Sequence, residues 1–151
     1  MNNDPRAQLS ATHHALTRGD LPTATRMSSQ MLELYPRWPP AVHLAGLVAR
    51  AAGDLSRAED LFKRSLQLPG VSGQMRAEYA NNLGNLLRTA GYPSQAEAAY
   101  REAVAAHELP QARIGLARIF LDTDRPEDAA AVLARIPPAR SEEHTSELQS
   151  R

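Results

Sequence analysis

The chain has 151 residues, of which 42% are hydrophobic and 5% aromatic, and its 17 basic residues balance 17 acidic ones. A net charge of zero gives no overall field that attracts nucleic acid or an anionic membrane, and the lack of cysteine excludes disulfides, thiolate metal sites and cysteine nucleophiles. The amino end carries no secretory signal, and no apolar run approaches the roughly 18 residues that cross a bilayer. We therefore expect a soluble, cytoplasmic protein.

Four turn sequences divide the chain at regular intervals. They read "RGDL", "AGDL", "AGYP" and "DTDR", and their spacings are 34, 38 and 33 residues. Apolar residues recur at helical spacing on both sides of each turn, which predicts two amphipathic helices per unit, roughly 5–18 and 21–35 in the first. An alanine follows each turn residue five positions later: Gly19 with Ala24, Gly53 with Ala58, Gly91 with Ala96, and Asp124 with Ala129.

The residues around these turns fit a helix-turn-helix unit. Glycine adopts the left-handed conformation that ends a helix, and aspartate tolerates it better than most residues. Pro22, Pro93 and Pro126 lie just inside the second helices, where a missing N–H costs nothing. Gly84 and Ala96 are small enough to let paired helices approach closely. The extra residues near "PGVSGQ" are expected to lengthen one loop between units by about four.

The pattern resembles the tetratricopeptide repeat (TPR), whose 34-residue unit reads W-x2-L-G-x2-Y, then A-x3-F, then P. No unit here has the early tryptophan. The resemblance implies an all-α fold, an α-solenoid of about four TPR helix-turn-helix repeats within residues 1–139, at about 5–38, 39–76, 77–109 and 110–137. The best matches are Gly46, Gly53, Ala58 and Phe62 in the second unit and Leu83, Gly84, Gly91, Ala96, Tyr100 and Ala103 in the third.

The last stretch, "RSEEHTSELQSR", breaks the pattern from Arg140 onward. It is similar to the in-frame translation of a common sequencing-library adapter, so we expect residues 140–151 to be a non-native tail. The native protein is then expected to continue past residue 139, because solenoids usually end in a capping element with a polar outer face. On this interpretation the chain is a fragment, and apolar surface around Val132, Leu133 and Ile136 is left uncovered.

The resemblance also implies that the first helix of each repeat lines a concave face that binds peptides. Asn82 matches a position where some family members align asparagines along peptide backbone, since an amide both donates and accepts hydrogen bonds. Its counterparts are Ser10, Leu44 and Gly115, so the chain has no asparagine ladder. For Asn81, Asn82 and Asn85 a solvated or helix-stacking role is the alternative. The other matching residues are Leu9, His13, Leu16, His43, Leu47, Arg50, Glu78, Arg88, Thr89, Ile114, Arg118 and Leu121.

Three arginines are candidates for anion binding. Arg50 and Arg88 occupy equivalent positions one repeat apart, and Arg118 lies nearby on the next first helix. Stacked guanidinium groups hold carboxylates or phosphates through paired hydrogen bonds, which predicts an acidic peptide or a free C-terminus as partner. The alternative is that these are ordinary exposed arginines.

We expect no catalytic residues, metal or cofactor. Adjacent His13 and His14 point in different directions on a helix, and no carboxylate-histidine pattern accompanies them. Serines and histidines lack nucleophile spacing, and no glycine-rich phosphate loop occurs. Trp38, in "YPRWPP", is expected to pack in the connection between repeats, with a role as an exposed partner anchor as the alternative.

These features predict a protein–protein interaction scaffold that binds a peptide or protein segment in its concave groove. The alternative is the N-terminal docking region of a larger bacterial enzyme. The stretch "NNLGNLLRTAGYPSQAEAAYREAV" is similar to repeats that precede bacterial sulfotransferases, glycosyltransferases and iron- and oxoglutarate-dependent hydroxylases. RNA binding is disfavoured, because the charge is neutral and no basic stripe occurs.

Overall fold

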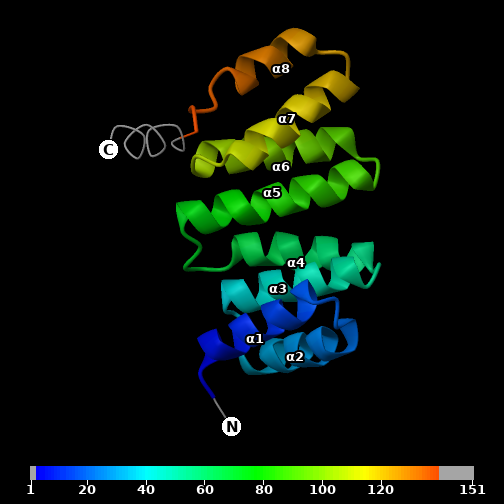
Figure 1. The fold of residues 1–151 in the computed structure, drawn as a ribbon, viewed down its shortest axis with the longest axis vertical. Helices are drawn as coiled ribbons and strands as arrows, with labels where there is room; N and C mark the ends of the chain where they lie inside the picture. Colours follow the sequence, from blue (N-terminus) through cyan, green and yellow to red (C-terminus); the bar gives the residue numbers. More distant parts are fainter. Residues whose placement is uncertain (1–2, 140–151) are drawn as a thin grey trace, which may run out of the picture.

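The computed structural model describes residues 3–139, which form eight α-helices stacked in consecutive pairs (Figure 1). Each helix packs against the next, and the first helices of neighbouring pairs also meet at α1–α3 and α5–α7. The predicted all-α solenoid of about four helix-turn-helix units is confirmed, while the predicted tail at 140–151 lies outside the described residues. The helices are α1 (Pro5–Thr17), α2 (Leu21–Leu34), α3 (Pro39–Ala51), α4 (Leu55–Gln67), α5 (Gly73–Thr89), α6 (Pro93–Ala106), α7 (Pro110–Asp122) and α8 (Pro126–Leu133).

The turns inside each pair have the predicted backbone. The chain leaves each first helix through a residue with positive φ, and an aspartate then caps two of the second helices. The side chains of Asp20 and Asp54 accept hydrogen bonds from backbone N–H groups three residues further on, at 3.3 and 3.1 Å. This satisfies donors that a helix N-terminus would leave unpaired. The positive φ values are +78° at Gly19, +84° at Gly53, +88° at Gly91 and +59° at Asp124.

The extra residues of the second repeat do not lie where we expected them. Helix α5 begins at Gly73 and has 17 residues, against 13 in α3 and 13 in α7. The expectation of a longer loop is therefore wrong, since most of the extra length extends this first helix at its N-terminus. The cause is a good cap followed by helix-forming residues: the Ser72 hydroxyl accepts a hydrogen bond from the Met75 N–H at 3.2 Å.

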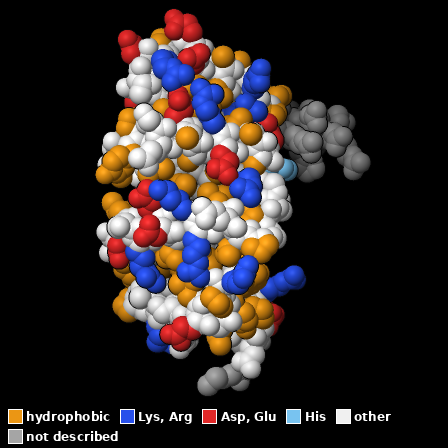
Figure 2. Space-filling model, turned by 180° about the vertical axis from the view of Figure 1, so that it is seen from behind, with side chains coloured by type: hydrophobic (Ala, Val, Ile, Leu, Met, Phe, Trp, Pro, Cys, Tyr) orange, Lys and Arg blue, Asp and Glu red, His pale blue; other side chains and the backbone are white. Residues whose placement is uncertain are grey.

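The outer face carries charges of both signs. Figure 2 shows the molecule from behind the view of Figure 1, with basic and acidic side chains interspersed among apolar ones. Several charged side chains of the described residues pair across helices, including Arg76 with Glu102 at 2.9 Å and Arg125 with Glu97. Mixed charges of this kind keep a surface soluble without creating a strong field of one sign.

Two predictions from the sequence concern the packing of Trp38 and the exposure of apolar residues at the last helix pair. Trp38 is half-buried between α2 and α3, where its ring meets that of Tyr35 edge-on with centroids 6.0 Å apart. On α8, Leu133 is 41% exposed, whereas Val132 is half-buried, and so is Ile136 just beyond it. Only Leu133 of the three residues expected to be uncovered is therefore exposed.

The core of the middle repeats is built from rings that face glycines. Phe62 and Tyr100 occupy equivalent positions on α4 and α6, and both are fully buried. A Cβ on Gly46 would lie 2.6 Å from the Phe62 ring, and one on Gly84 would lie 2.7 Å from the Tyr100 ring. Such separations are too short for a methyl group, so the predicted close approach at Gly84 depends on glycine.

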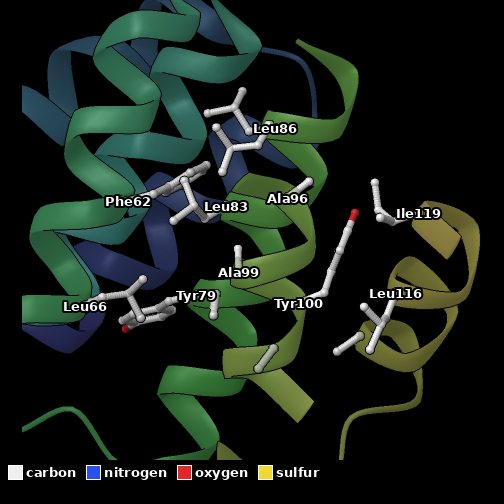
Figure 3. Close-up of a cluster of buried hydrophobic side chains, with 14 of the residues drawn as sticks. Phe62, Leu66, Tyr79, Leu83, Leu86, Ala96, Ala99, Tyr100, Leu116 and Ile119 are labelled. Atoms are coloured by element: carbon white, nitrogen blue, oxygen red, sulfur yellow. The ribbon is translucent and has the colours of Figure 1, made fainter. Parts of the chain in front are cut away.

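Tyr100 is held from a second side as well. Figure 3 shows its ring facing Leu116 and Ile119 of α7. A Cβ on Gly115 would approach this ring even more closely than one on Gly84. From the sequence, Gly115 was considered only as the counterpart of Asn82, so its packing role was missed. The ring of Tyr100 is therefore wedged between two helix backbones.

Enlarging Ala96 is expected to lower the free energy of unfolding. Ala96 is fully buried on α6, so Ala96→Leu should overpack the contact between α5 and α6 and cost about 1–3 kcal/mol. Urea unfolding followed by helix circular dichroism measures this effect. The matched control is Ala98→Leu, an exposed position on the same helix, and equal midpoints for the two variants would contradict the packing argument.

The first helices are less closely packed between α3 and α5 than elsewhere. α4 packs on α5, but the α3 and α5 backbones lie further apart than those of α1 and α3 or of α5 and α7. Rings bridge the gap. His43 of α3 stacks on Tyr79 of α5 with centroids 3.9 Å apart and also meets Phe62 at 5.0 Å. Side chains thus join the second and third repeats here, which leaves space for a pocket beside them.

Candidate functional site

A pocket of about 460 Å³ opens across α1, α3 and α5. We call it the groove pocket. Its exposed rim carries charges of both signs, Arg6 and Glu78, while Leu44 and Tyr79 are buried in its wall. It brings together His43, Asn82, Leu9, His13, Leu47 and Glu78 from the predicted concave face, and adds Arg6, Ser10, Pro40, Leu44 and Tyr79.

The imidazole of His43 is a neutral, fixed part of this pocket. Burial lowers its pKa from 6.5 to about 3, and the charge of Arg50 acts in the same direction. The Asn82 amide Nδ2 lies 3.0 Å from His43 Nε2. Because an amide nitrogen only donates, Nε2 is the acceptor and the ring proton is on Nδ1. That Nδ1 is buried and has no hydrogen-bond partner among residues 3–139.

Tyr79 is the main pocket residue that was not predicted from the sequence. It is 5% exposed, and burial, followed by the charge of Glu78, raises the pKa of its hydroxyl to about 12. The sequence did contain a signal. Counted back from the turn residues, the equivalent positions of the other three repeats are Ala7, Ala41 and Ala112, so a large ring stands where the fold elsewhere accommodates a methyl group.

Asn81 and Asn85 lie outside the lining of the groove pocket. Asn81 is 9% exposed, and its Oδ1 has no partner within the described part of the chain. Asn85 is exposed, and its Oδ1 accepts a 2.6 Å hydrogen bond from the Tyr100 hydroxyl. Burial raises the pKa of Tyr100, which keeps this hydroxyl protonated as the donor. Of these two asparagines, Asn85 is the one available to a ligand.

The three candidate arginines have different environments. Arg88 pairs with Asp122, with Nε and Oδ2 3.3 Å apart, so its charge is already neutralised. Arg50 is half-buried, its guanidinium lies 6.0 Å from the Phe62 ring centroid, and desolvation lowers its pKa. Arg118 is exposed. None of the three lines the groove pocket, and anion binding by this set stays a prediction.

The described part of the chain offers neither a metal site nor a membrane span. Between residues 3 and 139, no group of three or more histidine, aspartate or glutamate side chains is placed to hold a metal ion. In the same range, no helix combines the length and apolar character needed to span a membrane. The groove pocket therefore provides the structural basis for a functional proposal.

Comparison with known proteins identifies the repeat. Residues 81–144 match the family described as tetratricopeptide repeat, and no curated protein matches the chain. Solved structures share the fold. MamA has a TM-score of 0.76 at 15% identity over 97% of this chain and 82% of that chain. TTC0263, a thermophilic TPR protein in Thermus thermophilus, has a TM-score of 0.75 at 19% identity over 97% of this chain and 81% of that chain.

A third structure is a mutant of the O-GlcNAc transferase from Thermobaculum terrenum. It has a TM-score of 0.66 at 26% identity, and the match covers 80% of this chain but only 23% of the transferase. The matching family and the paired helices agree with the spacing of the turn residues and with the glycine-to-ring packing of the core. Residues 81–144 thus match the tetratricopeptide repeat family, and the described chain as a whole has the fold of a tetratricopeptide repeat protein.

Proposed function

We propose that the chain binds a peptide or protein segment in its concave groove, with one apolar side chain seated in the groove pocket. The observation that carries this proposal is a pocket formed by three successive first helices, with buried apolar walls and an exposed polar rim. Concave, mostly apolar pockets with a few polar groups are typical of ligand sites. The tetratricopeptide repeat fold generally serves as a protein-interaction scaffold, which supports the same conclusion.

The lining indicates which part of a partner enters the pocket. Leu9, Leu44 and Leu47 offer aliphatic surface, and Tyr79 offers a ring. Fully burying one leucine-sized side chain gains only about 1.5–3 kcal/mol. The pocket alone is therefore a weak site, and affinity requires further contacts along the groove. Whether the partner is acidic, as the three arginines predict, depends on those further contacts.

Placing a charge in the pocket is expected to weaken binding while leaving the fold intact. Leu47 is a half-buried lining residue, so Leu47→Glu should weaken by at least about tenfold the binding of peptides selected on the wild type from a displayed random library. Leu55→Glu is the matched control, because Leu55 is 42% exposed on α4 and outside the pocket. Equal binding by both variants would place the site elsewhere.

A docking region of a larger enzyme is the second candidate function. The similarity to the O-GlcNAc transferase supports it, because that chain is much longer than the matched repeats. On this proposal the groove presents a protein segment to a catalytic domain, and the repeats themselves carry no chemistry. Reading the native gene across codon 140 tests the idea. A catalytic domain there supports docking, whereas further repeats and a polar capping helix support the scaffold.

A further inference from the structure

A second pocket lies among the last three helices, which form the end of the stack opposite α1 (Figure 1). Helices α6 and α8 both pack on α7 but hardly on each other, and the pocket of about 350 Å³ opens between them. We call it the end pocket. It shares no residue with the groove pocket, so it is a separate candidate site.

The floor and sides of the end pocket are apolar. Leu116 and Phe120 of α7 line it and are each 4% exposed. Val104 of α6 and Val132 of α8 also line it, and both are half-buried. An apolar group seated between these four side chains would be removed from water, which favours binding in proportion to the area covered.

Charged side chains surround this apolar surface, and two of those that line the pocket already have partners. Arg113 donates from Nε and Nη2 to the two carboxylate oxygens of Glu108, at 2.9 and 3.0 Å. Asp128 accepts from Nε of Arg125 at 3.1 Å. These pairs neutralise one arginine and the one acidic residue that line the pocket.

The other two arginines that line the end pocket are less well neutralised. Arg101 Nε lies 3.8 Å from a carboxylate oxygen of Glu97, but that carboxylate also binds Arg125. Arg135 is exposed just past the end of α8, and its guanidinium makes no ion pair within residues 3–139. Four arginines around the pocket thus meet three carboxylates, so one positive charge is left over among the described residues.

We propose that the end pocket binds a small carboxylic acid with an apolar chain, whose carboxylate pairs with Arg135 and whose chain lies on Leu116 and Phe120. The planar guanidinium fork matches the geometry of a carboxylate and forms two parallel hydrogen bonds with it. One negative charge balances the one positive charge that is left over. A phosphate monoester carries nearly two negative charges at neutral pH and exceeds it.

The size and surroundings of the end pocket favour a small molecule over a protein partner. Its volume of about 350 Å³ is typical of small-molecule sites. A specific protein interface needs at least about 1,000 Å² of buried surface. None of the large exposed hydrophobic side chains within residues 3–139 lines this pocket, so the apolar contact surface ends at its rim.

Titration of the whole chain with four probes tests the proposal. Octanoate has both the carboxylate and the chain, 1-octanol lacks the charge, acetate lacks the chain, and monooctyl phosphate carries more charge. Binding is followed by nuclear magnetic resonance of the methyl groups of Val104, Leu116 and Val132. We expect saturable binding of octanoate, about tenfold weaker binding of octanol, no methyl shifts with acetate, and octyl phosphate binding no tighter than octanoate.

Each departure from this pattern overturns a defined part of the inference. Octanoate that leaves the three methyl signals unchanged would show that the end pocket is not a site for such acids. Equal binding of octanoate and octanol would remove the role of Arg135, and tighter binding of octyl phosphate would overturn the assignment to a carboxylate. Because the two pockets share no residue, none of these results affects the function proposed for the groove.

Two matched pairs of variants provide an independent check. Arg135→Gln should weaken octanoate about tenfold and leave octanol unchanged, whereas Arg118→Gln, at an exposed arginine outside the end pocket, should change neither. Ala131→Leu should fill the pocket and weaken both probes. Its neighbour Ala130 is exposed on α8 and does not line the pocket, so Ala130→Leu is the control. Unchanged octanoate binding by Arg135→Gln and Ala131→Leu would refute the site.

Discussion

Gly115→Ala is expected to lower the free energy of unfolding by about 2–3 kcal/mol, although alanine is the better helix former by roughly 1 kcal/mol. The added methyl group would collide with the Tyr100 ring, and the ring has no room to retreat, because the Gly84 backbone lies on its other side. Tyr100 is also tied by its hydroxyl to Asn85. Urea unfolding followed by circular dichroism gives the change directly.

Whether Gly115→Ala lowers or raises the free energy of unfolding depends on the Tyr100 ring, so removing that ring provides a control. In a Tyr100→Leu background the clash is removed, so Gly115→Ala should become neutral or stabilising through helix propensity alone. The coupling between the two changes in a double-mutant cycle should then be at least about 2 kcal/mol. Equal effects of Gly115→Ala in both backgrounds would show that the ring is not what excludes the methyl group.

Acidification from pH 7 to pH 5 is expected to destabilise the wild type by about 2 kcal/mol more than it destabilises His43→Phe. The pKa of His43 is about 3 in the folded chain, against an ordinary value of 6.5. Between pH 6.5 and pH 3, His43 is mostly protonated in the unfolded chain and mostly neutral in the folded chain. The contribution of neutral His43 to the free energy of unfolding is therefore fully present above pH 6.5, and it is lost as the pH drops toward 3. Phenylalanine keeps a ring against Tyr79 but takes up no proton.

The measurement is the free energy of unfolding in urea at both pH values. Carboxylates with lowered pKa, such as Asp20 and Glu108, lose stabilising charge only at lower pH and are present in both proteins. His14→Asn, a change at an exposed histidine, is the control and should keep the acid sensitivity of the wild type. If His43→Phe keeps it too, the loss arises from another group.

The repeat architecture was predictable because its signals are local. A glycine or aspartate that ends one helix and an aspartate that caps the next act within a few residues of the chain. The turns at Gly19, Gly53 and Asp124 could therefore be predicted without knowing which helices pack against them. The start of α5 shows the limit of such reading. Gly70 and Gly73 looked like loop, yet the cap at Ser72 lets the helix begin at Gly73.

The candidate site was less predictable because its features depend on pairs far apart in sequence. His43 and Asn82 were both named as candidates, but only the folded chain shows that one holds the other. The role of Gly115 follows from Tyr100 on another helix. Tyr79 is different, since comparison with the three equivalent alanines was possible from the sequence. The pairing of Arg88 with Asp122 also joins residues far apart in sequence, and anion binding by the three arginines stays a prediction.

The wider spacing of α3 and α5 has a mechanical consequence. Where helix backbones touch, bending the solenoid must compress or break many contacts at once, whereas at this joint the first helices meet mainly through the stacked rings of His43 and Tyr79. We therefore expect bending to concentrate between the second and third repeats, with the contact of α4 and α5 as the hinge. Opening the joint widens the groove pocket, and closing it narrows the pocket. A ligand that contacts α1, α3 and α5 at the same time would restrict this bending and so fix the curvature of the solenoid.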